Sequence, residues 1–180
     1  TLSATPECEA FEIEVTESKI TVCAHRLRGF IYGYSMLLRK CEIRDNSFIL
    51  TEDITRHYSP AKKIRGHQLG YRDTNNTCDA WGVEQYRRYL LELMMFGLNT
   101  FEGICDNEKQ NCLMPLSIKD MFTAVSAVCD ELDIDVSVWH PTYSDETDED
   151  VRAKIYDFYR EAKRVDVLFI PGGDPGDMMP

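Results

Sequence analysis

The sequence predicts an α/β protein in which a small α+β domain, residues 1–60, precedes the first half of a (β/α)8 barrel, residues 61–180. Three observations predict this fold. Alternating apolar residues near the amino end are typical of a β-hairpin. After Pro60, short apolar runs alternate with amphipathic segments at a period of about 35 residues, the pattern of repeated parallel βα units. The last apolar run opens into a glycine turn, as a parallel strand does at an active-site loop.

The small domain begins with two alternating runs, residues 11–15 and 20–24, which predict a hairpin with one buried face. Apolar residues at helical spacing then continue to Cys41, so we expect a helix up to that point. A short extended segment at 48–50 follows. Pro60 marks a linker, because the residue before a proline is biased towards extended backbone.

The second region contains four strands and three helices by the same reasoning. The strand candidates are short apolar runs between polar segments, at residues 64–69, 100–104, 135–139 and 165–170. Gly97 is placed to end the first helix. Ser117 begins the second, with Asp120 positioned as in a capping box. Acidic residues 148–150 open the third helix, where they favour the helix dipole.

Two closures suit repeated parallel units, namely an open doubly wound sheet and a (β/α)8 barrel. A doubly wound nucleotide-binding protein should carry a glycine-rich phosphate loop after its first strand. The chain has Gly66-His-Gln-Leu-Gly-Tyr-Arg72 there, which is neither GxGxxG nor GxxxxGK. The barrel is therefore favoured. Because a full barrel takes about 250 residues, we expect its second half to be missing and the exposed edges of the truncated barrel to self-associate.

Composition excludes several classes of partner. The net charge of −11 argues against nucleic acid or an anionic membrane surface as the partner. No apolar run approaches the roughly 20 residues that span a bilayer. The seven cysteines form no CxxC pair and the four histidines are scattered, so we expect no metal site and no cofactor. Unpaired cysteines favour a cytoplasmic location, with a secreted or periplasmic one as the alternative.

The candidate site residues come from the ends of the predicted strands, because barrel active sites form at the carboxyl ends. They are polar or aromatic and suit a hydroxyl-rich or anionic small molecule: Arg65, His67, Glu102, Trp139, His140 and Asp174. Arginine and carboxylate groups bind ring hydroxyls, and tryptophan stacks on the apolar face of a sugar. Four of them also have a structural interpretation: a salt bridge to Glu102 or Asp106 for Arg65, a core position for Trp139, a structural role for His67 and a turn position for Asp174.

Four motifs carry a resemblance to a known family. They are Arg28-Gly-Phe-Ile-Tyr-Gly33 followed by Leu37-Leu38, the segment Lys63-Ile-Arg65-Gly66, a helix ending at Phe96-Gly-Leu-Asn99, and Gly172-Gly-Asp174. With these motifs the chain resembles glycoside hydrolases of the β-N-acetylhexosaminidase and α-glucuronidase type. That family places a small α/β domain in front of a (β/α)8 catalytic barrel, and the resemblance covers nearly the whole chain.

The resemblance implies an exo-acting glycosidase that cleaves a carbohydrate glycosidic bond. Arg65 would bind hydroxyls of the terminal sugar, and Asp174 would be the general acid or would orient the substrate. The remaining subsite residues would be His67, Glu102, Trp139 and His140. Hexosaminidases have glutamate after Gly-Gly-Asp, whereas this chain has Pro175, and α-glucuronidases have Pro-Gly in the corresponding loop.

Both enzyme types therefore stay open, and the alternative is a non-catalytic carbohydrate-binding protein on the same scaffold. Glycosidases need two carboxyl groups. The second is expected beyond Pro180, so we expect the 180-residue chain to be inactive alone and leave retention or inversion unassigned.

Overall fold

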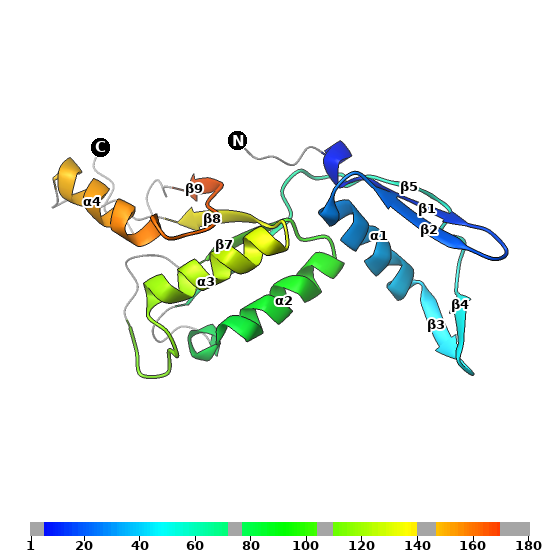
Figure 1. Ribbon diagram of the computed structural model, residues 1–180, viewed down its shortest axis with the longest axis horizontal. Helices are drawn as coiled ribbons and strands as arrows, with labels where there is room; N and C mark the ends of the chain where they lie inside the picture. The colour runs from blue at the N-terminus through cyan, green and yellow to red at the C-terminus, as the bar shows by residue number, and fades with distance from the viewer. Residues whose placement is uncertain (1–5, 72–76, 104–109, 140–146, 170–180) are drawn as a thin grey trace.

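The computed structural model describes residues 6–71, 77–103, 110–139 and 147–169 (Figure 1). They form an antiparallel α+β unit followed by a parallel sheet with helices, so the predicted mixed α/β class is confirmed. None of the four α-helices in these ranges combines the length and hydrophobicity that crossing a bilayer requires.

The antiparallel unit is a three-stranded sheet with one helix packed on it. Its strands are β1 (Phe11–Val15), β2 (Ile20–Ala24) and β5 (Arg56–Tyr58), in the order β2-β1-β5. Helix α1 (Leu27–Arg39) contacts β1 and β2, and a short 3-10 turn, Pro6–Glu9, precedes the sheet. Phe11 and Ile13 alternate with exposed glutamates and are buried, so the hairpin prediction is confirmed.

The chain after α1 differs from the sequence prediction. The helix ends at Arg39, and Cys41 starts strand β3 (Cys41–Arg44), so the prediction of helical structure up to Cys41 is wrong. β3 pairs with β4 (Ser47–Leu50) through a two-residue turn at Asp45 and Asn46, whose φ angles are 49° and 58°. Two positive φ values are what a type I′ hairpin turn requires, and such a turn interrupts any helical pattern.

Two glycines let α1 approach the small sheet closely. A Cβ at Gly29 would lie 2.7 Å from the backbone oxygen of Ala10, and one at Gly33 would lie 2.6 Å from Cγ1 of Val22. Both distances are too short for a real side chain. The glycines of the Arg28–Gly33 motif are therefore explained by helix–sheet packing.

The parallel sheet follows the linker and consists of four strands. They are β6 (Gly66–Leu69), β7 (Thr100–Gly103), β8 (Asp135–Trp139) and β9 (Val167–Phe169), hydrogen-bonded in chain order. In register, Gln68 lies beside Glu102, and Glu102 lies beside Ser137. The predicted strands are confirmed with small shifts, because β6 and β9 each begin two residues later than expected.

Three helices connect these strands: α2 (Val83–Met95), α3 (Ile118–Glu131) and α4 (Asp148–Tyr159). The structure confirms the predicted end of α2 and the predicted start of α3. Gly97 follows α2 with φ of 97°, and the Ser117 hydroxyl accepts a hydrogen bond from the backbone N–H of Asp120 at 3.1 Å. Thr147 makes the equivalent cap for α4, which the sequence reasoning did not identify.

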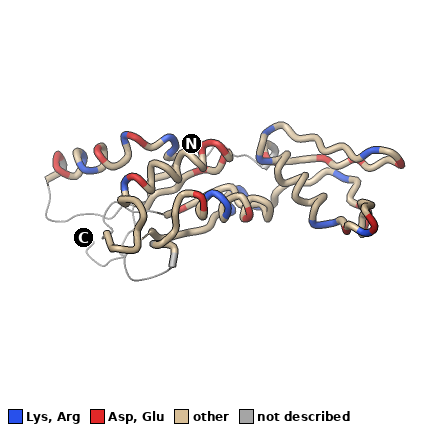
Figure 2. Tube along the Cα trace, turned by 60° about the horizontal axis from the view of Figure 1, so that its bottom comes forward, with Lys and Arg blue, Asp and Glu red and all other residues tan. Residues whose placement is uncertain are grey.

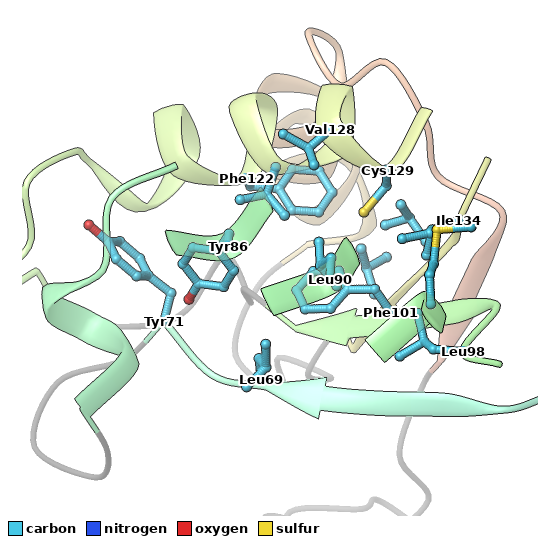
Figure 3. Close-up of a cluster of buried hydrophobic side chains, with 14 of the residues drawn as sticks. Leu69, Tyr71, Tyr86, Leu90, Leu98, Phe101, Phe122, Val128, Cys129 and Ile134 are labelled. Carbon is cyan, nitrogen blue, oxygen red and sulfur yellow. The ribbon is translucent and has the colours of Figure 1, made fainter. Parts of the chain in front are cut away.

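Helices α2 and α3 lie side by side on one face of the parallel sheet, and the main core lies between them and the strands (Figures 1 and 3). Phe101 from β7 meets Tyr86 of α2 edge-on, with ring centroids 6.4 Å apart. Phe122 of α3 contacts both Phe158 and Tyr159, which places α4 beside α3. Apolar residues at helical and strand spacing therefore point to one shared core.

A buried tyrosine joins the antiparallel unit to the parallel one. Tyr32 on α1 is 6% exposed, and its hydroxyl donates to the backbone oxygen of Leu98 at 2.7 Å. Tyr34, two residues along the same helix, is 50% exposed.

These two tyrosines make a matched test of the contact between units. Tyr32→Phe leaves the buried Leu98 carbonyl without its donor and should lower the free energy of unfolding by about 1–2 kcal/mol. Tyr34→Phe should change it by less than about 0.5 kcal/mol. Denaturant unfolding measures both, and equal effects of the two substitutions would contradict this account of the junction.

Candidate functional site

Arg65 lies at the amino edge of the parallel sheet, by which we mean the first residues of β6–β9 and those just before them. Its Nε donates to the backbone oxygen of Gly97 at 2.7 Å, and its Nη2 donates to Glu9 of the antiparallel unit. Active sites of parallel barrels form at the opposite edge. This position does not support the expected sugar-binding role of Arg65. Arg65 does form a salt bridge, but with Glu9 and not with Glu102, the partner named by the structural alternative.

An ionic cluster with a buried centre surrounds this contact and joins the two units. Its charged members are Glu9, Arg28, Arg65, Asp133, Asp135, Arg164 and Asp166. Arg28 donates to Asp135 Oδ1 at 2.6 Å and to Glu9 Oε1 at 3.1 Å, and all three side chains are at most 3% exposed. Asn99 also donates to Glu9 at 2.9 Å. Each buried charge in this trio therefore has partners.

The electrostatics of the cluster keep Arg28 charged. Burial alone would lower the pKa of Arg28, but the hydrogen bond to Asp135 and the charges of Asp135 and Asp133 outweigh burial and leave the pKa raised. For Tyr32 beside the cluster, burial raises the pKa, and the charge of Glu9 raises it further. Elsewhere acidic and basic residues are mixed along both units (Figure 2).

The second face of the parallel sheet, which α2 and α3 do not cover, carries a row of polar side chains. We call it the uncovered face and define it by Gln68, Glu102 and Ser137. Gln68 Nε2 donates to Glu102 Oε1 at 3.0 Å, and Ser137 Oγ donates to Glu102 Oε2 at 3.1 Å. The parallel register produces this row, because it sets the three residues side by side on neighbouring strands. Glu102 is half-buried at its centre.

A hollow of about 440 Å³ opens over this row. Its lining residues come from all four strands and from the chain just before β6: Ile64, Gly66, His67, Gln68, Thr100, Glu102, Ser137 and Val167. Several of these are small, which leaves space above the sheet. A volume of this size falls in the range of small-molecule sites, and the convergent polar groups are what such sites use to orient a ligand.

The structure brings some of the predicted site residues to this face and not others. Glu102 lies at its centre. Trp139 shares the face by strand alternation, because it lies two residues after Ser137. His67 borders the hollow, but its ring meets Tyr89 of α2 edge-on at 5.8 Å between centroids. His140 and Asp174 lie outside the described residues.

Sequence reasoning missed Thr100 and Ser137 as members of the site. A signal for Ser137 was present, because the β8 sequence Asp-Val-Ser-Val-Trp alternates polar or amphipathic residues with valine. Strands buried on both faces read as continuous apolar runs, whereas alternation marks one polar face. Within the described ranges, no three histidine, cysteine or acidic side chains are placed to hold a metal ion together.

In comparisons with known proteins, no family model matches this chain, and no curated protein matches it significantly. The relationship to glycoside hydrolases therefore stays a prediction that rests on the motifs. Of these motifs, Arg28–Gly33 and Arg65 have structural roles at the junction of the two units.

Substitution of Arg28 tests how much the ionic cluster contributes to the free energy of unfolding. Arg28→Met leaves Glu9 and Asp135 buried next to less positive charge, and it should lower the free energy of unfolding by about 3–5 kcal/mol. The matched control is Arg87→Met, which removes a solvent-exposed pair with Glu131 and should cost less than about 1 kcal/mol. Denaturant unfolding measures both. A small effect at Arg28 would mean that the cluster does not hold the units together.

Proposed function

We propose that the chain contributes half of a (β/α)8 barrel to a glycoside hydrolase and that the carboxyl-terminal end of the uncovered face borders the sugar-binding site. The observation that carries the proposal is the polar row of Gln68, Glu102 and Ser137, which lie side by side on three adjacent strands. Carboxylate, amide and hydroxyl groups are the side chains that bind sugar hydroxyls. Trp139 on the same face supplies an aromatic ring for stacking.

The strand order supports a barrel more than a doubly wound sheet. A doubly wound sheet reverses its strand order and carries helices on both faces. Here the four strands follow chain order, α2 and α3 lie on one face, and α4 lies beside α3. In a closed barrel the uncovered face would turn inward, and the carboxyl ends of β6–β9 would open towards the substrate.

The catalytic assignment comes from the family resemblance. Asp174, in the Gly-Gly-Asp motif after β9, would act as the general acid, and Glu102 with Trp139 would hold the sugar next to the cleaved bond. The second catalytic carboxyl group would come from the other half of the barrel. α-Glucuronidase-like and hexosaminidase-like activities are both compatible with this assignment.

A carbohydrate-binding protein without catalysis is the second candidate. It is favoured by Pro175, which follows Asp174 at the position where hexosaminidases carry their acidic glutamate. Proline cannot donate a proton. The polar row and the hollow would serve this function equally well.

Asp174→Asn in the full-length protein tests the enzymatic proposal. If Asp174 is the general acid, turnover of glycosides with poor leaving groups should fall by roughly 10²–10⁴. Activated aryl glycosides, whose leaving groups need little protonation, should be affected much less. Steady-state kinetics on both substrate types gives the comparison.

Equal losses on both substrate types would assign Asp174 to sugar binding. A wild-type protein that binds sugars but hydrolyses neither substrate would favour the binding-protein candidate.

A further inference from the structure

Helix α1 presents an apolar side to solvent. Its inner side packs on β1 and β2, and its only charged residue before Arg39 is Arg28, which is bound within the ionic cluster (Figure 1). A helix that is apolar all round is normally buried all round. The outer side of α1 nevertheless carries large apolar residues at helical spacing that are each 39–50% exposed: Leu27, Phe30, Tyr34 and Leu38.

The β3–β4 hairpin extends this apolar surface. Ile43 lies opposite Phe48 in the antiparallel register, and Cys41 lies on the same side of the hairpin because side chains alternate along a strand. Cys41 Sγ donates to the backbone oxygen of Leu38 at 3.4 Å, so this side of the hairpin adjoins the outer side of α1. Ile43 is 76% exposed and Phe48 is 46% exposed. We define the α1 face as Leu27, Phe30, Tyr34, Leu38, Ile43 and Phe48.

The area of the α1 face is large enough for a small dimer interface. Its six side chains are on average about half exposed, which at roughly 200 Å² for a large side chain leaves on the order of 600 Å² of apolar surface. This value is at the upper end of the roughly 300–600 Å² of the largest patch on a typical monomer. Two copies that meet here would bury about 1,200 Å² in total, which is the lower limit for specific, stable interfaces.

The distribution of charge also favours a second copy as the occupant. The chain has a net charge of −11, so two copies repel one another across surfaces that carry acidic residues. The six side chains of the α1 face are all uncharged. The neighbouring Glu42 and Arg44 lie on the other side of the hairpin, where they pair with each other. Two copies can therefore meet at the α1 face without burying a charge.

We propose that the α1 face binds a second copy of this chain, with the two α1 helices antiparallel about a two-fold axis. In such an interface the same surface is used on both copies. Phe30 of one copy then meets Tyr34 of the other, and Leu27 meets Leu38, because the two pairs have nearly the same midpoint along the helix. Aromatic rings thus pack against aromatic rings, and leucine packs against leucine. The inference is independent of the proposed carbohydrate function.

Sedimentation velocity over a range of protein concentrations tests the inference. Because the interface has the minimum size, we expect a reversible dimer with a Kd in the micromolar range. Phe30→Glu places a carboxylate at the centre of the apolar interface and should raise the Kd at least about tenfold. The matched control is Leu91→Glu on α2, which introduces the same charge at an apolar residue that is 41% exposed outside the α1 face. It should leave the Kd unchanged. Circular dichroism establishes that both variants are folded.

Leu168→Glu separates this interface from association through the edges of a truncated barrel. Leu168 is 46% exposed on β9, which is the last strand of the parallel sheet in the described ranges. The substitution should leave the dimer intact. If Leu168→Glu abolishes the dimer while Phe30→Glu keeps it, the copies meet at the sheet edge and the inference is overturned. A wild-type chain that stays monomeric at about 100 μM, well above a micromolar Kd, would overturn it as well.

Discussion

The ion pairs among Glu9, Arg28 and Asp135 are the interaction on which the arrangement of the protein depends. They join a turn before β1, the first turn of α1 and the start of β8, which lie far apart in the sequence. Buried charges are costly to desolvate unless they are paired with good geometry. Because all three side chains are nearly fully buried and both carboxylates bond to Arg28, the antiparallel unit is held in a defined position at the amino edge of the parallel sheet.

Because the antiparallel unit packs at the amino edge, different parts of the parallel sheet have different roles. The amino edge is occupied by the cluster, including Arg65, and the face towards α2 and α3 is filled by the core. The uncovered face is left with polar side chains and a hollow above them. In known (β/α)8 barrels, conserved residues at the amino ends of the strands serve stability and those at the carboxyl ends serve catalysis. The Arg28–Gly33 motif thus serves packing within the chain: Arg28 and Tyr32 join the two units, and two close-packed glycines let α1 approach the small sheet.

Local periodicity made much of the fold predictable from sequence. The four parallel strands, the Ser117 cap and the end of α2 at Gly97 follow from short-range patterns. Strand β5 was not predicted, because its three residues carry no clear alternation and their pairing with β1 is long-range. The role of Arg65 was inferred from its motif, but its partner Glu9 lies 56 positions earlier in the chain, and no local pattern links them. Glu102 was identified, whereas Ser137 depended on the strand register.

The most direct test of these separate roles is Arg65→Met, with the free energy of unfolding and the affinity for the proposed sugar ligand measured on the same sample. We expect a clear loss of stability, because the buried Glu9 carboxylate loses one of its cationic partners, and an unchanged affinity of the folded protein for the proposed sugar ligand. Unchanged stability with lost sugar affinity would contradict it. That result would place Arg65 in the proposed sugar site and would contradict the purely structural role assigned to the amino edge.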